Sequence, residues 1–373
     1  MSYFKKAAVP FLLAAFIFSG CSAGQDSASS PLLQGGDEMQ SQSQALEESS
    51  AATTPALREE SEIRNGTSEH TLATPSDFPE SYDYGSGLAE DWENGMLSAR
   101  LPEPDGNETV LNTAPDPSKF QALYLWEEGN APAQTEVTST NYDPVDFRPY
   151  LTAIPVRAGT EVKGAVILLA GGAFQVRGNY TDTLPTAAQL RELGFLTFIV
   201  DYRLRPYTQQ EGALDVARAV RFIRKNADTY GIDPDDIAVM GYSAGGIQAG
   251  EFFLNFDEDV LPTVLDPHYV PDELDEIPAH ACASGMIYSF YGRLSVASMD
   301  EEELRSGNLP PTFYCYGTED PFYRQFEAQY DLMQDVGVIT KRIVLQDWPH
   351  GFGGDGDWVE DYAQWLEQVF LCN

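Results

Sequence analysis

Residues 237–246 are the stretch that most constrains how this chain can fold. They read as a short apolar strand followed by the sequence Gly-Tyr-Ser-Ala-Gly-Gly, with the serine at position 243. Glycine on both sides of Ser243 suits a sharp turn between a strand and a helix, because a Cβ at either place would crowd the turn. Such a turn lifts the serine oxygen above the edge of a sheet. The pattern predicts that Ser243 is a nucleophile; a glycine-rich turn that happens to hold a serine is the alternative.

Two backbone N–H groups near this serine are candidates for an oxyanion hole. The first N–H groups of a helix have no intrahelical acceptor and carry partial positive charge, so the N–H of Ala244 can face an oxyanion. The second donor should come from the loop after the apolar run 164–170, where the sequence continues Gly-Gly-Ala-Phe. We therefore predict that the N–H of Gly172 or Ala173 joins that of Ala244.

A serine hydroxyl needs a neighbouring base, and histidine is the usual one. The chain has four histidines, at positions 70, 268, 280 and 350. In folds with this turn the chain order is serine, acid, histidine. Only His350, which follows the last predicted strand at 339–345, leaves room for a strand and an acid after Ser243. The sequence predicts His350 as the base, with an ordinary loop histidine as the alternative.

The acid that orients the base should also follow a strand. Asp320 lies in Gly-Thr-Glu-Asp-Pro (317–321), directly after the predicted strand 312–316, and so on the same sheet edge as Ser243. Glu319 is a competitor and Asp347 a weaker one. Asp320 could also serve as a plain turn residue before proline. We predict Asp320 as the acid that holds the imidazole.

Apolar runs and amphipathic segments alternate from about residue 118 to the end. Strands are expected at 120–126, 149–156, 164–170, 195–200, 237–240, 281–288, 312–316 and 339–345, and helices at 186–193, 214–230, 244–256, 323–336 and 359–370. Helix 214–230 should carry its basic residues on an outer face. Alternation of this kind predicts an α/β fold, a mostly parallel sheet with helices on both faces and right-handed crossovers. Ligands bind at the carboxyl ends of the strands in such sheets.

The N-terminus is typical of a targeting segment. Two lysines, Lys5 and Lys6, precede an apolar run at 7–18 that is too short to span a bilayer. Ser-Gly-Cys then ends the segment, and it resembles the lipobox of bacterial lipoproteins. We expect 1–21 to be a signal peptide with lipidation at Cys21, which would anchor the protein on the extracellular side of the bacterial membrane. The alternative is an ordinary secretory signal with an incidental cysteine.

Residues 22–117 are poor in aromatic residues and rich in Ser, Gln, Glu, Thr and Pro. A segment of this composition buries too little apolar area to offset its ordering entropy. We predict a disordered acidic and polar linker, with a short ordered patch possible at 82–97 where aromatic residues return. The catalytic domain should then occupy 118–373.

The net charge of −36 excludes some partners. A chain of 373 residues with 58 acidic and 22 basic residues should bind neither nucleic acid nor anionic lipid electrostatically. A membrane contact is expected only through the lipid anchor. No metal-ligand spacing is visible, and Cys282 and Cys315 lie in strand-like apolar runs, so they are predicted to be buried thiols. The chemistry predicted at Ser243 requires no cofactor.

From about Leu125 to its end, the chain resembles the α/β-hydrolase esterases, and most of all the bacterial acetyl-xylan-esterase-like branch. The stretches that carry the resemblance are Leu-Trp-Glu-Glu-Gly-Asn-Ala-Pro (125–132), Asp-Tyr-Arg-Leu (201–204), Arg-Ala-Val-Arg-Phe (218–222), Tyr-Gly-Ile-Asp-Pro (230–234), the serine motif, Gly-Thr-Glu-Asp (317–320) and His-Gly-Phe-Gly (350–353). The resemblance implies that Ser243, Asp320 and His350 form a triad. The chain departs from the sequence pattern of this branch at two places, Ala-Gly-Gly-Ala (170–173) and Ile-Gln (247–248). These departures affect the prediction of the substrate more than that of the reaction.

The expected function is a serine esterase that removes short acyl groups, acetyl above all, from carbohydrate through an acyl-serine intermediate. The expected partner is a small-molecule or polysaccharide ester substrate. One alternative is a carboxylesterase or lipase of small lipophilic esters, but the insertions at 257–280 and 293–309 are acidic and polar rather than apolar lids. A serine peptidase of the prolyl type would need a gating domain, which 22–117 cannot build. A non-catalytic surface binding protein should have lost a triad residue, and none is missing.

Overall fold

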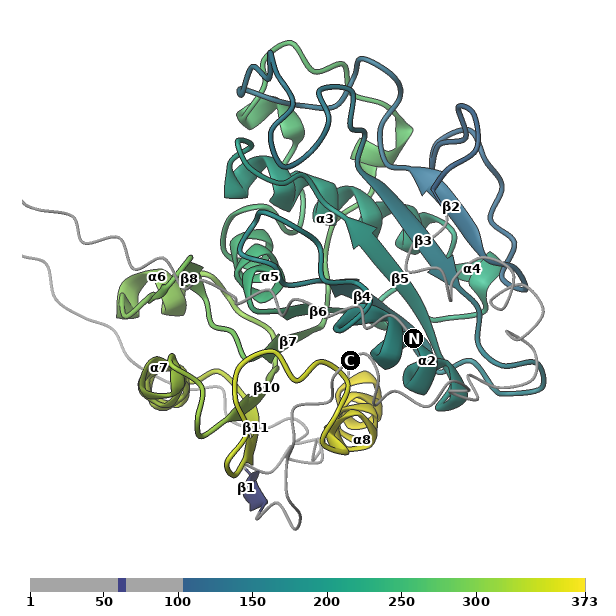
Figure 1. Cartoon of the computed structure of the whole chain (residues 1–373). Helices are drawn as coiled ribbons and strands as arrows, with labels where there is room; N and C mark the ends of the chain where they lie inside the picture. The colour runs from purple at the N-terminus through teal and green to yellow at the C-terminus, as the bar shows by residue number, and fades with distance from the viewer. Residues whose placement is uncertain (1–59, 65–102, 373) are drawn as a thin grey trace, which may run out of the picture. The chain divides into compact units, whose positions relative to one another are not determined.

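The computed structural model describes residues 60–64 and 103–372, and a mixed β-sheet lies at its centre. Within those residues the sheet has nine strands, in the order β1 (Glu60–Arg64), β11 (Thr340–Leu345), β10 (Thr312–Gly317), β7 (Ala283–Ile287), β6 (Ile237–Tyr242), β4 (Gly164–Leu169), β5 (Phe195–Asp201), β3 (Tyr150–Ile154) and β2 (Gln121–Tyr124). Neighbours from β1 to β5 pair in parallel, whereas β3 and β2 run antiparallel to their neighbours (Figure 1). The predicted mostly parallel sheet is confirmed.

Helices cover both faces of this sheet. On one face α3 (Gln209–Lys225) packs against α5 (Ala244–Asn255), and on the other α2 (Thr183–Glu192) packs against α8 (Trp358–Phe370) (Figure 1). The remaining elements are α4 (Ala227–Tyr230), α6 (Glu301–Ser306), α7 (Tyr323–Asp335), the 3-10 helices η1 (Pro262–Val264) and η2 (Glu273–Glu276), and a small hairpin of β8 (Gly292–Arg293) and β9 (Val296–Ala297).

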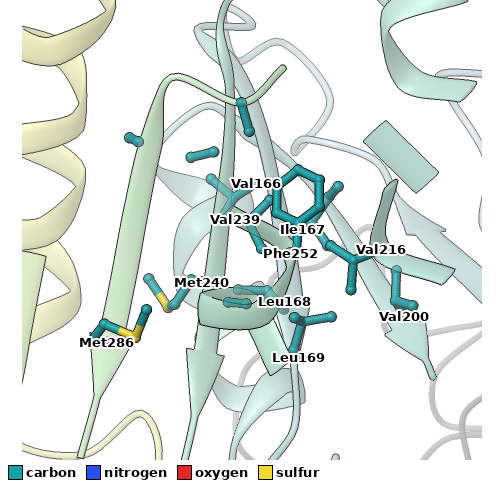
Figure 2. Packing of buried hydrophobic residues seen from close by; sticks show 14 of the residues in the cluster. Val166, Ile167, Leu168, Leu169, Val200, Val216, Val239, Met240, Phe252 and Met286 are labelled. Atoms are coloured by element: carbon teal, nitrogen blue, oxygen red, sulfur yellow. The ribbon is translucent and has the colours of Figure 1, made fainter. Parts of the chain in front are cut away.

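The central strands are continuous apolar runs because they are covered from both sides. Every residue of β4, β5 and β6 is buried, as expected for parallel strands between two helical layers. Figure 2 shows Ile167 of β4 and Val239 of β6 packed near Phe252 of α5 and Val216 of α3. Burial of each such side chain contributes about 1.5–3 kcal/mol to folding. This core holds the strand ends, and the loops that follow them, in fixed positions.

The long helix begins earlier than predicted and ends earlier too. Thr208 caps it, since its side-chain oxygen accepts a hydrogen bond from the N–H of Glu211, and the Glu211 carboxylate accepts one from the N–H of Thr208. This reciprocal cap is the Thr-x-x-Glu pattern that starts many helices. The helix therefore covers Gln209–Lys225 rather than 214–230, and a separate turn, α4, follows it.

The prediction that α3 carries its basic residues on an outer face is wrong for Arg218 and Arg221. Both side chains are fully buried. Arg218 binds both carboxylate oxygens of Asp272, at 2.7 and 2.6 Å, and Arg221 donates to the backbone oxygens of Ile277 and Val260 at 2.9 and 2.6 Å. A buried guanidinium is tolerated when hydrogen bonds and nearby carboxylates offset its desolvation, and Nη1 of Arg221, which has no hydrogen-bond partner among the described residues, lies 3.8 Å from Oδ1 of Asp275. The insertion at 257–280 therefore uses some of its acidic residues to bind α3.

The predicted linker boundary at 117 also needs correction. Thr109 and Val110 are buried, and residues around them pair with Tyr124 of β2, whose carbonyl oxygen accepts the N–H of Val110 at 2.8 Å. Backbone pairing with the edge of the sheet orders this segment despite its polar composition. Within the predicted linker, 60–64 also form β1 and extend the sheet beside β11. The signal peptide 1–21, Cys21, the patch at 82–97 and the rest of the linker up to residue 102 lie outside the described residues.

Three further expectations concern cysteines, membranes and metals. Cys282 and Cys315 are buried, as predicted. In the described part of the chain, no helix is both long and apolar enough to cross a bilayer. The same residues contain no group of three or more His, Cys, Asp or Glu side chains that could hold a metal ion.

Candidate active site

Ser243 stands at the junction of β6 and α5 in a backbone conformation that L-residues rarely adopt, with φ 48° and ψ −118°. Such a residue costs about 1–3 kcal/mol of strain, which the surroundings must offset. Here the Ser243 N–H donates to the carbonyl oxygen of Ile287 at 3.0 Å, and the Ser289 hydroxyl donates to the carbonyl oxygen of Ser243 at 2.6 Å. These bonds hold the turn between the strand and the helix in place.

The flanking glycines are required by close backbone contacts. A Cβ on Gly241 would lie 2.2 Å from the carbonyl oxygen of Gly245. A Cβ on Gly245 would lie 2.0 Å from the carbonyl oxygen of Leu169, on the neighbouring strand β4. Neither backbone atom can move aside as a flexible side chain could. The serine motif therefore forms the sharp turn that the sequence predicts, rather than an ordinary glycine-rich loop.

The structure brings Ser243, His350 and Asp320 together in one hydrogen-bonded chain. Nε2 of His350 lies 2.9 Å from Oγ of Ser243, and Nδ1 of His350 lies 2.6 Å from Oδ2 of Asp320. The Asp320 carboxylate is buried, and its Oδ1 accepts the N–H of Phe322 at 2.8 Å. Since a carboxylate can only accept, the proton of the neutral imidazole belongs on Nδ1. Nε2 is then left with a lone pair directed at the Ser243 hydroxyl.

The competing acids and histidines lie elsewhere. Glu319 and Asp347 have exposed side chains. Asp347 accepts a hydrogen bond from its neighbour Gln346. His268 is exposed, and His280 is paired with Glu258 at 3.2 Å. His70 is outside the described residues.

Two aromatic rings flank the His350 imidazole. The buried Tyr288 ring meets it edge to face at a centroid distance of 4.8 Å, and the half-buried Phe322 ring does so at 5.7 Å. Edge-to-face contacts of this kind fix ring orientation and contribute about 0.5–1.5 kcal/mol each. His350 keeps 29% of its side-chain surface exposed, so the imidazole is held in place and still accessible.

The loop after β4 has the shape needed for an oxyanion hole. Gly172, Ala173 and Phe174 all have positive φ, at 131°, 56° and 57°. The carbonyl oxygen of Gly172 turns inward and accepts the N–H groups of Gln175 and Val176 at 2.9 and 3.2 Å. Among the described residues, none accepts a hydrogen bond from the backbone N–H of Gly172, Ala173 or Ala244. These donors remain available to a substrate, and their role as an oxyanion hole stays a prediction.

Ion pairs behind this loop anchor it to the domain. Arg177 binds both carboxylate oxygens of Asp143, at 2.9 and 2.7 Å, and donates to the carbonyl oxygen of Tyr202 at 2.7 Å. Asn179 donates to the carboxylate of Asp201, at the end of β5, at 3.0 Å. Burial raises the pKa of Asp201 to about 6. These contacts of Arg177 and Asn179 hold the later part of the loop in place.

Three residues that were not predicted from the sequence contact the site, namely Asp182, Tyr288 and Ser289. Asp182 precedes α2 and reads like an ordinary helix cap, yet its carboxylate is buried and accepts the N–H of Gly171 at 2.8 Å and the hydroxyl of Tyr288 at 2.7 Å. Positions so far apart in the sequence give no local pattern. The signal available for Tyr288 and Ser289 was their position at the carboxyl end of the predicted strand 281–288, where both carry hydroxyl groups.

Comparisons with known proteins agree with this architecture. Residues 154–259, which include Ser243 and the loop after β4, match the family model described as BD-FAE. An acetylxylan esterase of Xylanibacter ruminicola is 24% identical over 219 residues, covering 55% of this chain and 45% of that protein. Esterase LipQ of Mycobacterium tuberculosis is 32% identical over 197 residues, covering 47% of each. The chain thus spans about half the length of these two relatives.

A solved structure covers more of the fold. The acetyl ester-xyloside bifunctional hydrolase from Caldicellulosiruptor lactoaceticus superposes with a TM-score of 0.51 at 20% identity, over 67% of this chain and 95% of that one. At this identity the likeness concerns the fold. Together with the parallel sheet and the strand-turn-helix at Ser243, it shows that the chain has the α/β-hydrolase fold.

Proposed function

We propose that the protein is a serine hydrolase that cleaves short-chain acyl esters, acetyl above all, from carbohydrate through an acyl-serine intermediate. The observation that carries the proposal is the hydrogen-bonded chain Ser243–His350–Asp320. Each of these residues follows a parallel strand: Ser243 follows β6, His350 follows β11 and Asp320 follows β10. The names of the acetylxylan esterase and of the acetyl ester-xyloside hydrolase support the choice of acyl group and alcohol.

In the proposed reaction Ser243 and His350 act twice. As Oγ of Ser243 attacks the ester carbonyl carbon, Nε2 of His350 takes its proton. The resulting oxyanion is held by the N–H of Ala244 and that of Gly172 or Ala173. The tetrahedral intermediate collapses, and His350 returns the proton to the leaving alcohol oxygen. Water then repeats the sequence on the acyl-serine and releases the carboxylic acid, while Asp320 stabilises each imidazolium.

The runner-up is a carboxylesterase or lipase-like enzyme that prefers small lipophilic esters. The observation that favours it is the apolar surface beside the base, since the half-buried Phe322 ring packs on both His350 and Phe290. The relatives also include a para-nitrobenzyl esterase of Bacillus subtilis, 32% identical over 95 residues. The serine peptidase and the non-catalytic binding protein have no comparable support.

Product release from defined esters separates these functions. We expect acetate release from acetylated xylo-oligosaccharides and, among p-nitrophenyl esters, the highest kcat/KM for acetate, with a steady fall through butyrate to octanoate. A preference for octanoate, with no acetate released from the oligosaccharides, would favour the lipase-like alternative. Release by the wild type that is no faster than by a Ser243→Ala variant would contradict hydrolysis through Ser243.

We further propose that Cys21 carries a lipid and tethers the catalytic domain to the outer face of the bacterial membrane. The support is the sequence pattern of a basic start, a short apolar run and Ser-Gly-Cys. Cells that express the full chain and are fed an alkyne fatty acid should yield labelled protein, and Cys21→Ala should abolish the label. Cys372→Ala is the matched control and should keep it. An unlabelled wild type, or a labelled Cys21→Ala variant, would contradict the anchor.

A further inference from the structure

A second carboxylate, Asp182, lies buried beneath the candidate active site. Its side chain is 5% exposed. Oδ2 accepts the N–H of Gly171 at 2.8 Å, and Oδ1 accepts the hydroxyl of Tyr288 at 2.7 Å and that of Thr181 at 3.2 Å. Among the described residues, no lysine or arginine forms an ion pair with it. This carboxylate is thus held by neutral donors.

One of these donors, the N–H of Gly171, belongs to the loop between β4 and α2 (residues 170–182), which carries the predicted oxyanion donors and is called the oxyanion loop. Gly171 directly precedes Gly172 and Ala173, and a Cβ on Gly171 would lie 3.0 Å from the Cβ of Ser243. The carbonyl oxygen of Gly171 is occupied as well, since it accepts the N–H of Gly178 at 2.9 Å. With its N–H bound to Asp182 and its carbonyl bound to Gly178, the residue has little freedom to rotate. Asp182 thereby helps to fix the plane of the next peptide, which bears the N–H of Gly172.

The other main donor is the Tyr288 hydroxyl, which also contacts the loop 350–353 that carries His350. The Tyr288 hydroxyl donates to Asp182 and accepts the N–H of Gly353 at 3.3 Å. The Tyr288 ring packs edge to face on His350 at 4.8 Å and on Phe352 at 4.7 Å. Asp182 therefore fixes the hydroxyl of the ring that orients the imidazole. Through two hydrogen bonds this single carboxylate connects the oxyanion loop with the loop 350–353.

The charge of Asp182 also bears on the base. Burial raises the pKa of the Asp182 carboxyl, while its bonds to Tyr288 and Gly171 and a positive charge on His350 oppose the rise. The other titratable groups around it, Tyr202 and Tyr242, stay neutral because burial raises their pKa. A carboxylate in this position favours the imidazolium form of His350, in the same sense as Asp320 does.

A buried charge without a cation is a poor way to gain stability, because its desolvation cost is repaid only by hydrogen bonds. We propose that Asp182 is a positioning residue for the serine hydrolase proposed above, on which this inference rests: it fixes the oxyanion loop through Gly171, and through Tyr288 it orients and electrostatically supports His350. Asp182 itself does not touch the substrate.

The test variant is Asp182→Asn, which keeps the size of the side chain but loses the charge and one acceptor. We expect kcat on p-nitrophenyl acetate to fall by about 10²-fold, as a small misplacement of reacting groups can cause, with KM nearly unchanged. Loss of the negative charge disfavours the imidazolium, so the acid limb of kcat/KM should move to lower pH. An unchanged kcat and an unchanged pH profile in a folded variant would overturn the proposal.

A readout without turnover separates this inference from the proposed function. The full chain has only four histidines, so the ring signals of His350 can be assigned in an NMR titration by their loss in His350→Ala. In Asp182→Asn the titration midpoint of His350 should move to lower pH, whether or not acetyl esters are the substrate. Asp201→Asn, at another buried carboxylate, is the matched control and should leave the midpoint in place.

Tyr288→Phe supplies a second variant if Asp182→Asn does not fold. It keeps the ring against His350 but removes the hydroxyl that joins it to Asp182. We expect kcat to fall in this variant too, and the double variant to lose less than the product of the two single losses. An unchanged kcat and an unchanged His350 midpoint in Tyr288→Phe alone would overturn the link from Asp182 to the base, and so would fully multiplicative losses in the double variant.

Discussion

Replacing Ser243 by alanine is expected to lower kcat on an acetyl ester by about a millionfold, the scale seen when a serine hydrolase loses its nucleophile. Without Oγ, His350 has no hydroxyl to deprotonate at 2.9 Å, and no acyl-enzyme can form. KM should change little, because alanine removes one atom and leaves the oxyanion donors in place. Steady-state hydrolysis of p-nitrophenyl acetate measures both constants.

The control is a serine with no contact to the site. Ser306, at the end of α6, is exposed, and Ser306→Ala should keep the wild-type rate. Both variants should unfold at nearly the wild-type temperature. Within the described part of the chain, the hydroxyl of Ser243 makes no hydrogen bond that holds the turn between β6 and α5, and Ser306 is exposed. Residual activity of Ser243→Ala within tenfold of the wild type would show that another residue performs the attack.

Asp320→Asn should lower kcat by about 10⁴-fold, although it changes little in size. The N–H of Phe322 binds one oxygen of the present carboxylate, so the carbonyl oxygen of the new amide should face Phe322. Its NH₂ group then faces Nδ1 of His350, which must become an acceptor. The imidazole proton moves to Nε2, and Nε2 can no longer take the proton of Ser243. Steady-state kinetics near neutral pH measures the loss.

The neighbouring Glu319→Gln is the matched control, since it removes an adjacent exposed carboxylate. It should leave kcat within about twofold of the wild type, because a solvent-exposed charge is largely screened. A large loss in Glu319→Gln together with a small one in Asp320→Asn would show that Glu319, and not Asp320, is the acid that orients His350.

Much of the site could be predicted from the sequence because parallel strands impose a simple geometry. Their carboxyl ends lie on one edge of the sheet, so residues that directly follow strands meet there. Ser243, Asp320 and His350 follow β6, β10 and β11, and they form one hydrogen-bonded chain. The strands themselves were visible as apolar runs, since helices bury both faces of the sheet.

Other features depend on pairings that no local pattern records. Asp182 binds Tyr288 across 106 positions, and Arg218 binds Asp272 across 54. A helical arginine reads as solvent-exposed until its acidic partner is known. Likewise, the segment around Val110 looks too polar to fold alone, but it pairs with Tyr124 at the sheet edge. Tertiary contacts of this kind override composition and periodicity.

Mass spectrometry of acid-quenched enzyme can reveal whether Ser243 carries the acyl group during turnover. Wild-type protein mixed rapidly with excess p-nitrophenyl acetate should yield one acetyl group, located on the peptide that contains Ser243. Ser243→Ala should yield none under the same conditions. Acetylation of a different residue, or hydrolysis by the wild type with no acetylated Ser243 at any quench time, would contradict catalysis through an acyl-Ser243 intermediate.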